Sequence, residues 1–576
     1  MKITIDKQTV QVSEPMSILD AAKSVGIKIP TLCYHEDLPP IGSCGVCVVE
    51  IEGLGVKRAC VTPIYDGMNI DTHSHQVIKH RKMAVELMLS DHPLDCLTCE
   101  RSGRCDLQSL AENLAITNIR YPRLKYKEKE LDTSSPSLVR DPNKCIRCKR
   151  CVQMCDNIQS VEAIDVMGRG YETTITVAYD QGMGNSTCVN CGQCISVCPV
   201  GAIYEKRDID HVWEALDNPD KFVVVQEAPA VRVSLAEEFG LDIGDDATGK
   251  MYSALKMLGF DAIFDTNFAA DLTIMEEGTE LLQRVKEGGP FPLITSCSPG
   301  WIKFMETFYP DMKNNTSSCK SPQQMFGAMV KTYFAKKNNI DPRRIISVSI
   351  MPCTAKKFEA LRPEMNASGY RDVDYVLTTR ELVRMIKEVG IDFANLPEVS
   401  ADTLMGSYTG AAVIFGATGG VMEAALRTAY EVYTGKTLSN LDFEVVRGME
   451  GIRESSVDLN GLEVKIAVAH GLDNARTLLD KVQEHKKKHK GESPYHFIEV
   501  MTCPGGCVGG GGQPYGSTMD KRSKRAQGLY DIDGSLKLRK SHENPAVKKA
   551  YEEFLGEPNS KLAHKLLHTH YVRRKY

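Results

Sequence analysis

The sequence predicts a multidomain protein in which small α+β domains precede one large α/β domain. Three observations support this prediction. The chain has 576 residues, 42% of them hydrophobic, which is enough for several domains. Fifteen of its 20 cysteines fall before residue 200, all in tight groups. After about residue 208, apolar runs typical of strands alternate with helical segments, which favours α/β layers with mostly parallel sheets.

The composition excludes several functional classes. The formal net charge of -5 and the pI near 6.3 argue against nucleic-acid binding. The N-terminus has neither a signal-peptide core nor a twin arginine, and no run of 18 apolar residues predicts a membrane span. We therefore expect a cytoplasmic protein, in which clustered cysteines indicate metal or redox chemistry rather than disulfides. The one basic run, 486–490, is expected to be a solvated insertion between elements.

Residues 1–78 are predicted to form an α+β domain that holds a [2Fe-2S] cluster. Alternating apolar residues predict two short strands near 3–5 and 10–12, and a helix is expected over 17–25. Four thiolates spaced C-x10-C-x2-C-x12-C can then hold the cluster, and these are Cys33, Cys44, Cys47 and Cys60. The spacing resembles the N-terminal ferredoxin-like domain of the large iron–sulfur subunit of NADH dehydrogenases and of some hydrogenases. A structural zinc is the alternative.

Residues 79–125 are predicted to be helical, with an apolar stripe of Met83, Leu87 and Met88. The pattern H-x3-C-x2-C-x5-C supplies one imidazole and three thiolates, from His92, Cys96, Cys99 and Cys105. This spacing resembles the [4Fe-4S] site with one histidine and three cysteine ligands of the same two families. A neutral imidazole in place of a thiolate removes one negative charge and should raise the cluster's potential. Zinc held by the same four side chains is the alternative.

Residues 126–208 contain an internal repeat of a four-cysteine run, C-x2-C-x2-C-x3-C. Two such runs are the signature of bacterial two-cluster ferredoxins, in which the fourth cysteine of each run binds the other cluster. One [4Fe-4S] cluster is therefore expected on Cys145, Cys148, Cys151 and Cys198. The second is expected on Cys188, Cys191, Cys194 and Cys155.

Residues 209–576 are predicted to form the large α/β domain, with strands at 222–226, 293–295, 345–350, 374–377, 464–469 and 495–500. A helix is expected to open at Thr379-Arg380-Glu381, with Thr378 or Thr379 as its N-cap. Three cysteine-containing loops follow strands, at 295–301, 351–359 and 499–514. Because sites form at the carboxyl ends of parallel strands, we expect the three loops to build one buried site. The glycines of the third loop are expected to leave room for a bulky cofactor.

These three loops resemble the signature motifs of [FeFe]-hydrogenases. Met351-Pro352-Cys353-x-x-Lys356-x-x-Glu359 matches the second motif, and Glu499-x-Met501-x-Cys503-x-x-Gly506-Cys507-x-x-Gly510-Gly511-Gly512-x-Pro514 matches the third. The resemblance extends over essentially the whole chain. It implies an H-cluster, a [4Fe-4S] cubane bridged to a two-iron unit that carries CO, cyanide and a dithiolate.

The resemblance also implies roles for the pocket residues. Cys507 would bridge the cubane and the two-iron unit, and Cys353 and Cys503 would be cubane ligands. Lys356 would bind a cyanide, while Met351 and Met501 would pack beside the two-iron unit and exclude water. For three further residues a plain core role and a pocket role remain equal alternatives: Pro229, Gln323 and Phe415.

The first motif departs from the family pattern T-S-C-C-P-x-W, because Ser298 stands where the second cysteine ligates the cubane. A hydroxyl is a far weaker iron ligand than a thiolate. Three alternatives remain: Ser298 ligates or leaves the iron to water, Cys297 takes over as ligand, or the chain is impaired in building its H-cluster. Cys319 is a further thiol, for which a structural role is expected.

A proton route is implied by the same resemblance. On the residues alone, Glu277, Glu280 and Arg284 share one line of a helix and would form a solvated face. In the family the route runs from Cys297 through Glu277, Ser317 and Glu280 toward Arg284. Carboxyls on such a line can pass protons if burial raises their pKa toward neutrality.

The expected activity is reversible oxidation of H2. Four N-terminal clusters suggest delivery of electrons to flavin- and NAD(P)-binding iron–sulfur subunits that resemble those of NADH dehydrogenases, as in electron-bifurcating enzymes of anaerobes. No nucleotide-binding motif occurs in this chain. Ferredoxin is a second possible acceptor, and maturation proteins are expected to build the H-cluster. The alternative is a non-catalytic electron-relay or redox-sensing homologue.

Overall fold

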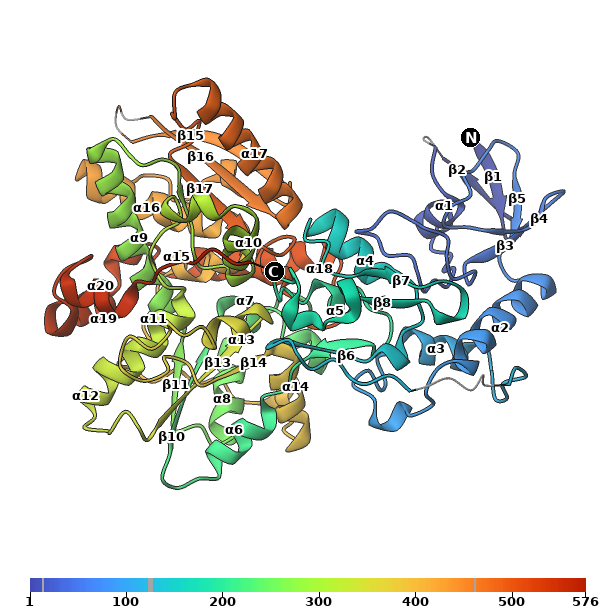
Figure 1. The fold of residues 1–576 in the computed structure, drawn as a ribbon, viewed down its shortest axis with the longest axis horizontal. Helices are drawn as coiled ribbons and strands as arrows, with labels where there is room; N and C mark the ends of the chain where they lie inside the picture. The colour runs from blue at the N-terminus through green and yellow to red at the C-terminus, as the bar shows by residue number, and fades with distance from the viewer. Residues whose placement is uncertain (13–14, 123–127, 460, 462, 576) are drawn as a thin grey trace.

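The computed structural model describes residues 1–576 except 13–14, 123–127, 460, 462 and 576. Small cysteine-rich segments from the first 208 residues lie beside a large α/β body (Figure 1). Among the described residues, no helix combines the length and the apolar character that crossing a membrane would require.

A five-stranded mixed sheet, in the order β2-β1-β5-β3-β4, forms the N-terminal region. The expected hairpin pairs β1 with β2, and the expected helix is α1, which begins after the N-cap Ser17. Ile3 and Ile5 point to a core that α1 covers. The bounds are β1 (Lys2–Ile5), β2 (Gln8–Gln11), α1 (Ile18–Ser24), β3 (Val48–Ile51), β4 (Gly55–Arg58) and β5 (Asn69–Asp71).

Two helices, α2 (His75–Ser90) and α3 (Asp106–Asn113), follow. The predicted apolar stripe on α2 is wrong for Leu87 and Met83, which are 50% and 36% exposed, whereas Met88 packs against a core. The buried face instead carries Arg81, which donates to two carbonyls of the β3 segment. Contact with β3 decides which face of α2 is buried, and the apolar pattern of the helix itself does not reveal that partner.

The repeat region consists of short elements that carry the same backbone turns in both halves. Positive φ angles recur at Arg147 and Lys149 in the first cysteine run and at Asn190 and Gly192 in the second. Each run then enters a short helix. The bounds are β6 (Leu138–Arg140), α4 (Arg150–Gln153), the π-helical turn η3 (Met154–Ile158), β7 (Asp165–Met167), β8 (Thr174–Thr176), α5 (Gln193–Val197) and β9 (Ile203–Glu205).

Two four-stranded sheets form the frame of the large body. The first, in the order β11-β10-β13-β14, is parallel throughout. The second, in the order β12-β17-β16-β15, is parallel except for the β15–β16 pair. The bounds are β10 (Phe222–Glu227), β11 (Ala262–Asp265), β12 (Leu293–Ile294), β13 (Ile345–Met351), β14 (Tyr375–Thr378), β15 (Ile452–Asp458), β16 (Glu463–His470) and β17 (Phe497–Met501).

Helices cover both sheets. Helix α14 starts with a capping box of Thr378 and Glu381, so the N-cap is Thr378. The basic run is not an insertion between elements, because Lys486–Lys488 form the last turn of α17, where cations favour the helix dipole. The bounds are α6 (Ile209–Leu216), α7 (Pro229–Arg232), α8 (Thr248–Met257), α9 (Asn267–Glu287), α10 (Pro299–Phe308), α11 (Pro322–Met329), α12 (Ala335–Lys337), α13 (Ala355–Ala360), α14 (Thr379–Glu388), α15 (Gly410–Val413), α16 (Gly420–Thr434), α17 (Leu472–Lys488), α18 (Met519–Ser535), α19 (Pro545–Ala550) and α20 (Lys561–Leu567).

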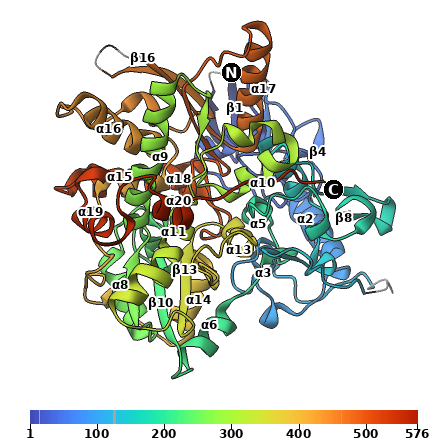
Figure 2. The same cartoon turned by 60° about the vertical axis from the view of Figure 1, so that its left-hand side comes forward.

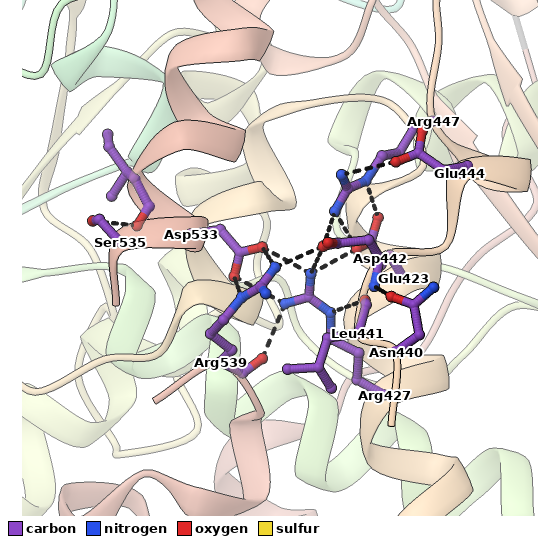
Figure 3. A network of polar contacts seen from close by, with 11 residues as sticks. Glu423, Arg427, Asn440, Leu441, Asp442, Glu444, Arg447, Asp533, Ser535 and Arg539 are labelled. Carbon is purple, nitrogen blue, oxygen red and sulfur yellow. Dashed lines mark hydrogen bonds and ion pairs between the residues drawn. The ribbon is translucent and has the colours of Figure 1, made fainter. Parts of the chain in front are cut away.

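A buried network of arginines and carboxylates fastens α18 to α16 (Figure 3). Arg427 of α16 donates to Glu423 at 2.6 Å and to both oxygens of Asp533 on α18 at 2.8 and 2.9 Å, and all three side chains are fully buried. Arg447 adds bonds to Glu423, and Arg539 adds bonds to Asp533. Several guanidinium partners for each carboxylate offset the cost of removing these charges from water.

Helix α18 also contacts the third cysteine loop and the N-terminal domain. Arg525 donates to the carbonyl of Val508 at 2.9 Å. Arg522 forms a bidentate pair with Asp37, at 2.7 and 2.9 Å. One helix therefore links three parts of the chain that are far apart in sequence (Figures 1 and 2).

Candidate functional site

An apolar cavity lies between the two four-stranded sheets, at the carboxyl ends of their parallel strands. The loops that follow β10, β12, β13 and β17 form its walls, together with α11 and the short turn η11 (Ile414–Gly416). All the predicted pocket residues line this one cavity: Pro229, Cys297, Ser298, Gln323, Met351, Cys353, Lys356, Phe415, Met501, Cys503 and Cys507. The three loops therefore build one site, and the remaining wall is mostly alanine, glycine and proline.

The ammonium group of Lys356 is held at the cavity wall by a buried carboxylate. Its Nζ donates to the carbonyl of Cys297 at 3.1 Å and pairs with Glu359 at 2.9 Å. Glu359 also accepts from Ser321 at 2.8 Å and from Gln323 at 3.2 Å. Gln323 therefore does more than fill the core, because it orients the carboxylate that positions Lys356.

The cavity thiols sit in a dry environment that opposes free thiolates. Burial raises the pKa of Cys507 to about 12, and it also raises the pKa of Cys353 and Cys503. The nearby Lys356 acts in the opposite direction on Cys353 and Cys507. Such thiols lose their protons when a metal takes the proton's place. Three convergent thiols, apolar walls and one ammonium fit the anionic iron–sulfur cofactor that the sequence predicts.

The hydroxyl of Ser298 has protein partners. Its Oγ lies 2.7 Å from Oγ1 of Thr502 and accepts from the backbone N–H of Thr502 at 3.3 Å. Ser298 occupies the N-cap position of α10 but makes no side-chain capping bond. The structure thus turns this hydroxyl toward the third loop, while the neighbouring Cys297 also lines the cavity.

The glycines of the third loop allow backbones to pack against each other. Gly506 and Gly510 also line the cavity, and the room that the glycines leave for a cofactor stays a prediction. A Cβ on Gly511 would lie 2.2 Å from the carbonyl oxygen of Cys191, and one on Gly510 would lie 2.1 Å from that of Pro352. The side chain of Gln193 adds a bond to the carbonyl of Gly509 at 2.8 Å. The second cysteine run of the repeat therefore abuts the cavity wall directly.

Two smaller cavities gather the eight cysteines of the repeat. One is lined by Cys145, Cys148, Cys151 and Cys198, and the other by Cys155, Cys188, Cys191 and Cys194. The fourth cysteine of each run joins the other run, as in the two-cluster signature. In both halves a left-handed turn aims a backbone N–H at a sulfur, from Arg147 to Cys145 and from Asn190 to Cys188, both at 3.4 Å. Such N–H···S contacts fit cluster ligands.

The four cysteines of the first domain also converge. The sulfur atoms of Cys47 and Cys60 are 3.3 Å apart, and the N–H of Cys44 donates to Cys33 at 3.4 Å. A side-chain contact between Cys33 and Cys60 closes the group. This donor set fits the predicted [2Fe-2S] cluster.

His92 has the features of a neutral ligand. Burial lowers the pKa of its imidazole, and Nδ1 bonds to the carbonyl of Pro93 at 2.6 Å. Its Nε2 is buried and has no hydrogen-bond partner in the described part of the chain. Metal-bound histidines commonly bond one ring nitrogen to a carbonyl and leave the other nitrogen for the metal. Cys96 begins the turn η1 (Cys96–Thr98), Cys99 follows it, and Cys105 immediately precedes α3.

A line of polar side chains leads away from the cavity along α9. Glu277 is 1% exposed, and burial raises its pKa to about 8. Ser317 bonds to Glu277 and donates to Glu280 at 2.8 Å, and Glu280 pairs with Arg284 at 2.7 Å. The helix face that would be solvated on its sequence alone is thus partly buried. Cys297 lies close enough to Glu277 for their charges to interact.

Glu359 and Glu499 were assigned no role from the sequence, although both occur in the matched motifs. Glu499 is fully buried and accepts from the N–H groups of Gly419 and Met422, at 2.7 Å each, at the start of α16. A helix N-terminus favours a carboxylate. The fixed positions of these glutamates in the motifs are the signal that could have found them.

Buried acids should make the stability of the protein depend on pH. Burial raises the pKa of Asp271 and Glu499 to about 7 and that of Glu277 to about 8. The unfolded chain releases these protons near pH 4, whereas the folded chain keeps them until about pH 7 to 8. The resulting stabilisation of the folded state is fully present below about pH 4 and is lost as the pH rises through 7 to 8. We expect calorimetry to show a lower melting temperature at pH 8.5 than at pH 6, and a smaller drop in Glu277→Gln. Equal drops in both proteins would contradict this.

Comparison with known families gives matches along most of the chain. Residues 221–511 match the iron only hydrogenase large subunit, C-terminal domain, and residues 519–574 match the iron hydrogenase small subunit. Residues 1–75 match a 2Fe-2S iron-sulfur cluster binding domain. Residues 81–120 match the NADH-ubiquinone oxidoreductase-G iron-sulfur binding region, and residues 135–204 match the ferredoxin-like domain of NADH-quinone oxidoreductase subunit 3.

Individual relatives agree with these matches. The chain is 50% identical to the NADP-reducing hydrogenase subunit HndD of Solidesulfovibrio fructosivorans, over 100% of this chain and 99% of that protein. It is 43% identical to iron hydrogenase 1 of Clostridium pasteurianum, over 97% and 98%. A solved structure of a variant of [FeFe]-hydrogenase HydA1 from Chlamydomonas reinhardtii is 46% identical, with a TM-score of 0.56 over 63% of this chain and 99% of that one. The chain therefore belongs to the [FeFe]-hydrogenase family, with iron–sulfur domains like those of NADH dehydrogenases at its N-terminus.

Proposed function

We propose that this chain catalyses the reversible oxidation of H2 to two protons and two electrons. The observation that carries the proposal is the single cavity in which the thiols, Lys356 and the apolar residues of all three loops meet. The line through Glu277 starts beside this cavity, and the repeat region packs against its wall. A bound H-cluster would supply the redox chemistry, and the protein would supply the ligands, exclude water from the site and transfer protons.

In this proposal each side chain has a defined task. Cys353 and Cys503 would hold the cubane of the H-cluster, and Cys507 would be the ligand shared with its two-iron unit. Lys356, fixed by Glu359, would offer its N–H groups to a cyanide of that cofactor, and Met351 and Met501 would exclude water. Cys297 exchanges protons with Glu277, whose pKa of about 8 allows both uptake and release near neutral pH. Ser317 and Glu280 carry the proton toward Arg284 and the surface.

Electrons would leave through the N-terminal domains. The cluster site of Cys155, Cys188, Cys191 and Cys194 abuts the third loop, so it is the first acceptor. We propose one [2Fe-2S] and three [4Fe-4S] clusters in addition to the H-cluster. The relative that is named as an NADP-reducing hydrogenase subunit supports NAD(P) as the electron acceptor. We further propose flavin-containing partner subunits, ferredoxin as a second acceptor and a cytoplasmic location.

The rival function is an electron relay or redox sensor without hydrogenase activity. The hydrogenase and the relay functions can be distinguished with full-length protein that has been matured anaerobically with its maturation proteins. A hydrogenase shows infrared bands of CO and cyanide and takes up H2 with an artificial dye. A relay would keep the electron paramagnetic resonance signals of the N-terminal clusters and lack both properties, and that result would refute the proposal. The match of residues 221–511 to a hydrogenase family favours the hydrogenase.

Ser298→Cys should raise both the iron content and the turnover of the matured protein. A thiolate binds iron better than a hydroxyl, and the change removes the hydroxyl that Thr502 now binds. Iron analysis and dye-linked H2 uptake measure the two effects. Thr502→Val is the matched control, because it removes the side-chain partner of the Ser298 hydroxyl without adding a thiol and should raise neither. If Ser298→Cys behaves like the parent protein, Cys297 already serves as the ligand.

A further inference from the structure

Arg101 is a buried cation without a carboxylate partner. Its side chain is 5% exposed, and its Nη2 donates to the carbonyl of Cys198 at 3.0 Å. Its Nε and Nη1 are buried and lack hydrogen-bond partners, and no carboxylate within the described ranges lies at ion-pair distance. A guanidinium group stays protonated in proteins, so a full positive charge is buried here.

Acidic groups lie close to Arg101 but are bound to other bases. Arg101 lines a cleft between the N-terminal segments and the large body, together with several carboxylates. The pairs are Asp106 with Arg150 at 3.4 Å, Glu238 with Arg104 at 2.7 Å, Glu237 with Arg525 at 2.7 Å and Glu36 with Lys23 at 3.3 Å. The ring of Tyr515 covers the guanidinium at 3.8 Å, which offsets only part of the cost of burying an ion. The contacts of the described residues therefore leave the charge of Arg101 without a close ion-pair partner.

Two cluster sites meet at Arg101. The carbonyl that accepts its Nη2 belongs to Cys198, which lines one cluster cavity of the repeat. Cys99, two residues before Arg101, is a predicted ligand of the other cluster. Gly201 lies between them, since a Cβ there would be 2.7 Å from the sulfur of Cys99 and 3.6 Å from Cγ of Arg101.

We propose that Arg101 is the shared counter-charge of two neighbouring [4Fe-4S] clusters and raises the reduction potential of both. These are the cluster on His92, Cys96, Cys99 and Cys105 and the cluster on Cys145, Cys148, Cys151 and Cys198. The inference rests on the proposed occupancy of these sites. Clusters held by three or four thiolates are anions, and each added electron makes them more negative. A fixed, poorly hydrated cation at this position stabilises the reduced forms, because Coulomb interactions are strong in a buried environment.

Arg101 is thus a positioning residue that acts through charge and does not touch the reacting atoms. Its bond to a carbonyl in a ligand segment and its stacking on Tyr515 fix the distance to both clusters. Raising both potentials together would keep two adjacent members of the relay close in energy, so that an electron passes between them in either direction.

The test is a redox titration of reconstituted full-length protein, followed by electron paramagnetic resonance. Arg101→Gln should lower the midpoints of both [4Fe-4S] signals enough to change the oxidised-to-reduced ratio at least tenfold, about 59 mV for a one-electron couple. The [2Fe-2S] midpoint should stay unchanged. Arg101→Lys should keep both midpoints close to those of the parent protein, because lysine retains the positive charge. Arg104→Gln is the matched control, because Arg104 lines the same cleft but is paired with Glu238 and has a side chain that is 33% exposed.

Several results would overturn the inference. If both [4Fe-4S] signals of Arg101→Gln titrate as in the parent protein, Arg101 does not set either potential. If only one midpoint moves, Arg101 is not a shared counter-charge. If the parent protein lacks the two signals altogether, the proposed occupancy itself fails. A second measurement covers variants that do not assemble clusters. In cluster-free protein Arg101→Gln should raise the melting temperature, because it removes an uncompensated charge, and a lowered melting temperature would show that the charge has another partner.

Discussion

Replacing Glu277 by glutamine is expected to lower H2 turnover by about two to four orders of magnitude. The side chain is buried, its pKa is raised to about 8, and it joins Ser317 and Glu280 in one hydrogen-bonded line. A glutamine keeps the size of the side chain but cannot accept and release a proton at the carboxyl. Dye-linked H2 uptake measures the loss. The infrared bands of CO and cyanide should persist, because Glu277 holds no part of the cofactor.

The neighbouring residue provides a matched control for this experiment. Glu276 is also fully buried on α9, but it faces the C-terminal segment, where it binds Tyr551 and pairs with His568 at 3.0 Å. Glu276→Gln should therefore keep most of the turnover, even if the protein becomes less stable. Full turnover in Glu277→Gln with intact infrared bands would exclude the proposed proton route.

Replacing Arg427 by methionine is expected to lower the free energy of opening of α18 by about 3–5 kcal/mol. The change leaves Glu423 and Asp533 buried without their shared central partner. Burial opposes ionisation of Asp533, and bonds from Arg427 and Arg539 keep its pKa below the ordinary value. The remaining arginines lie at the rim of the network and replace only part of the lost interaction. Amide hydrogen exchange of residues 519–535, measured by mass spectrometry, reports the opening free energy.

A surface pair provides the control for that variant. Lys481 pairs with Glu454 at 2.7 Å, and their side chains are 53% and 41% exposed. Lys481→Met should change local stability by no more than about 1 kcal/mol, because an exposed pair is screened by solvent. Similar exchange in α18 of Arg427→Met and of the parent protein would show that the network does not hold the helix.

Features encoded in local spacing could be predicted from the sequence. The repeat of four cysteines led to the two sets that the structure gathers around two cavities. The loops that follow the predicted strands converge on one site because parallel strands place their carboxyl ends at a common edge. The sequence left Thr378 and Thr379 as alternative caps of α14, and the structure selects Thr378 because it forms a capping box with Glu381.

Features decided by distant partners could not be predicted. The exposure of Leu87 depends on how α2 packs against β3, and the backbone contacts of Gly511 depend on a loop more than 300 residues away in sequence. On sequence alone, Glu277 falls on a line that would be solvated, and only its neighbours in the fold bury it. Arg101 gave no signal, because an arginine beside a cysteine run is ordinary until its charge proves to be buried and unpaired.

The covalent continuity between the third loop and α18 has a consequence for assembly. In the family description, the segment that matches residues 519–574 is a small subunit, whereas here it continues the same polypeptide. Joining two binding partners by a short linker replaces association in solution with an effective concentration of about millimolar. Docking of α18 is then independent of the protein concentration, and each large α/β domain always has its own copy of this segment. The Arg427 network therefore has to fix the orientation of this segment but does not have to capture it.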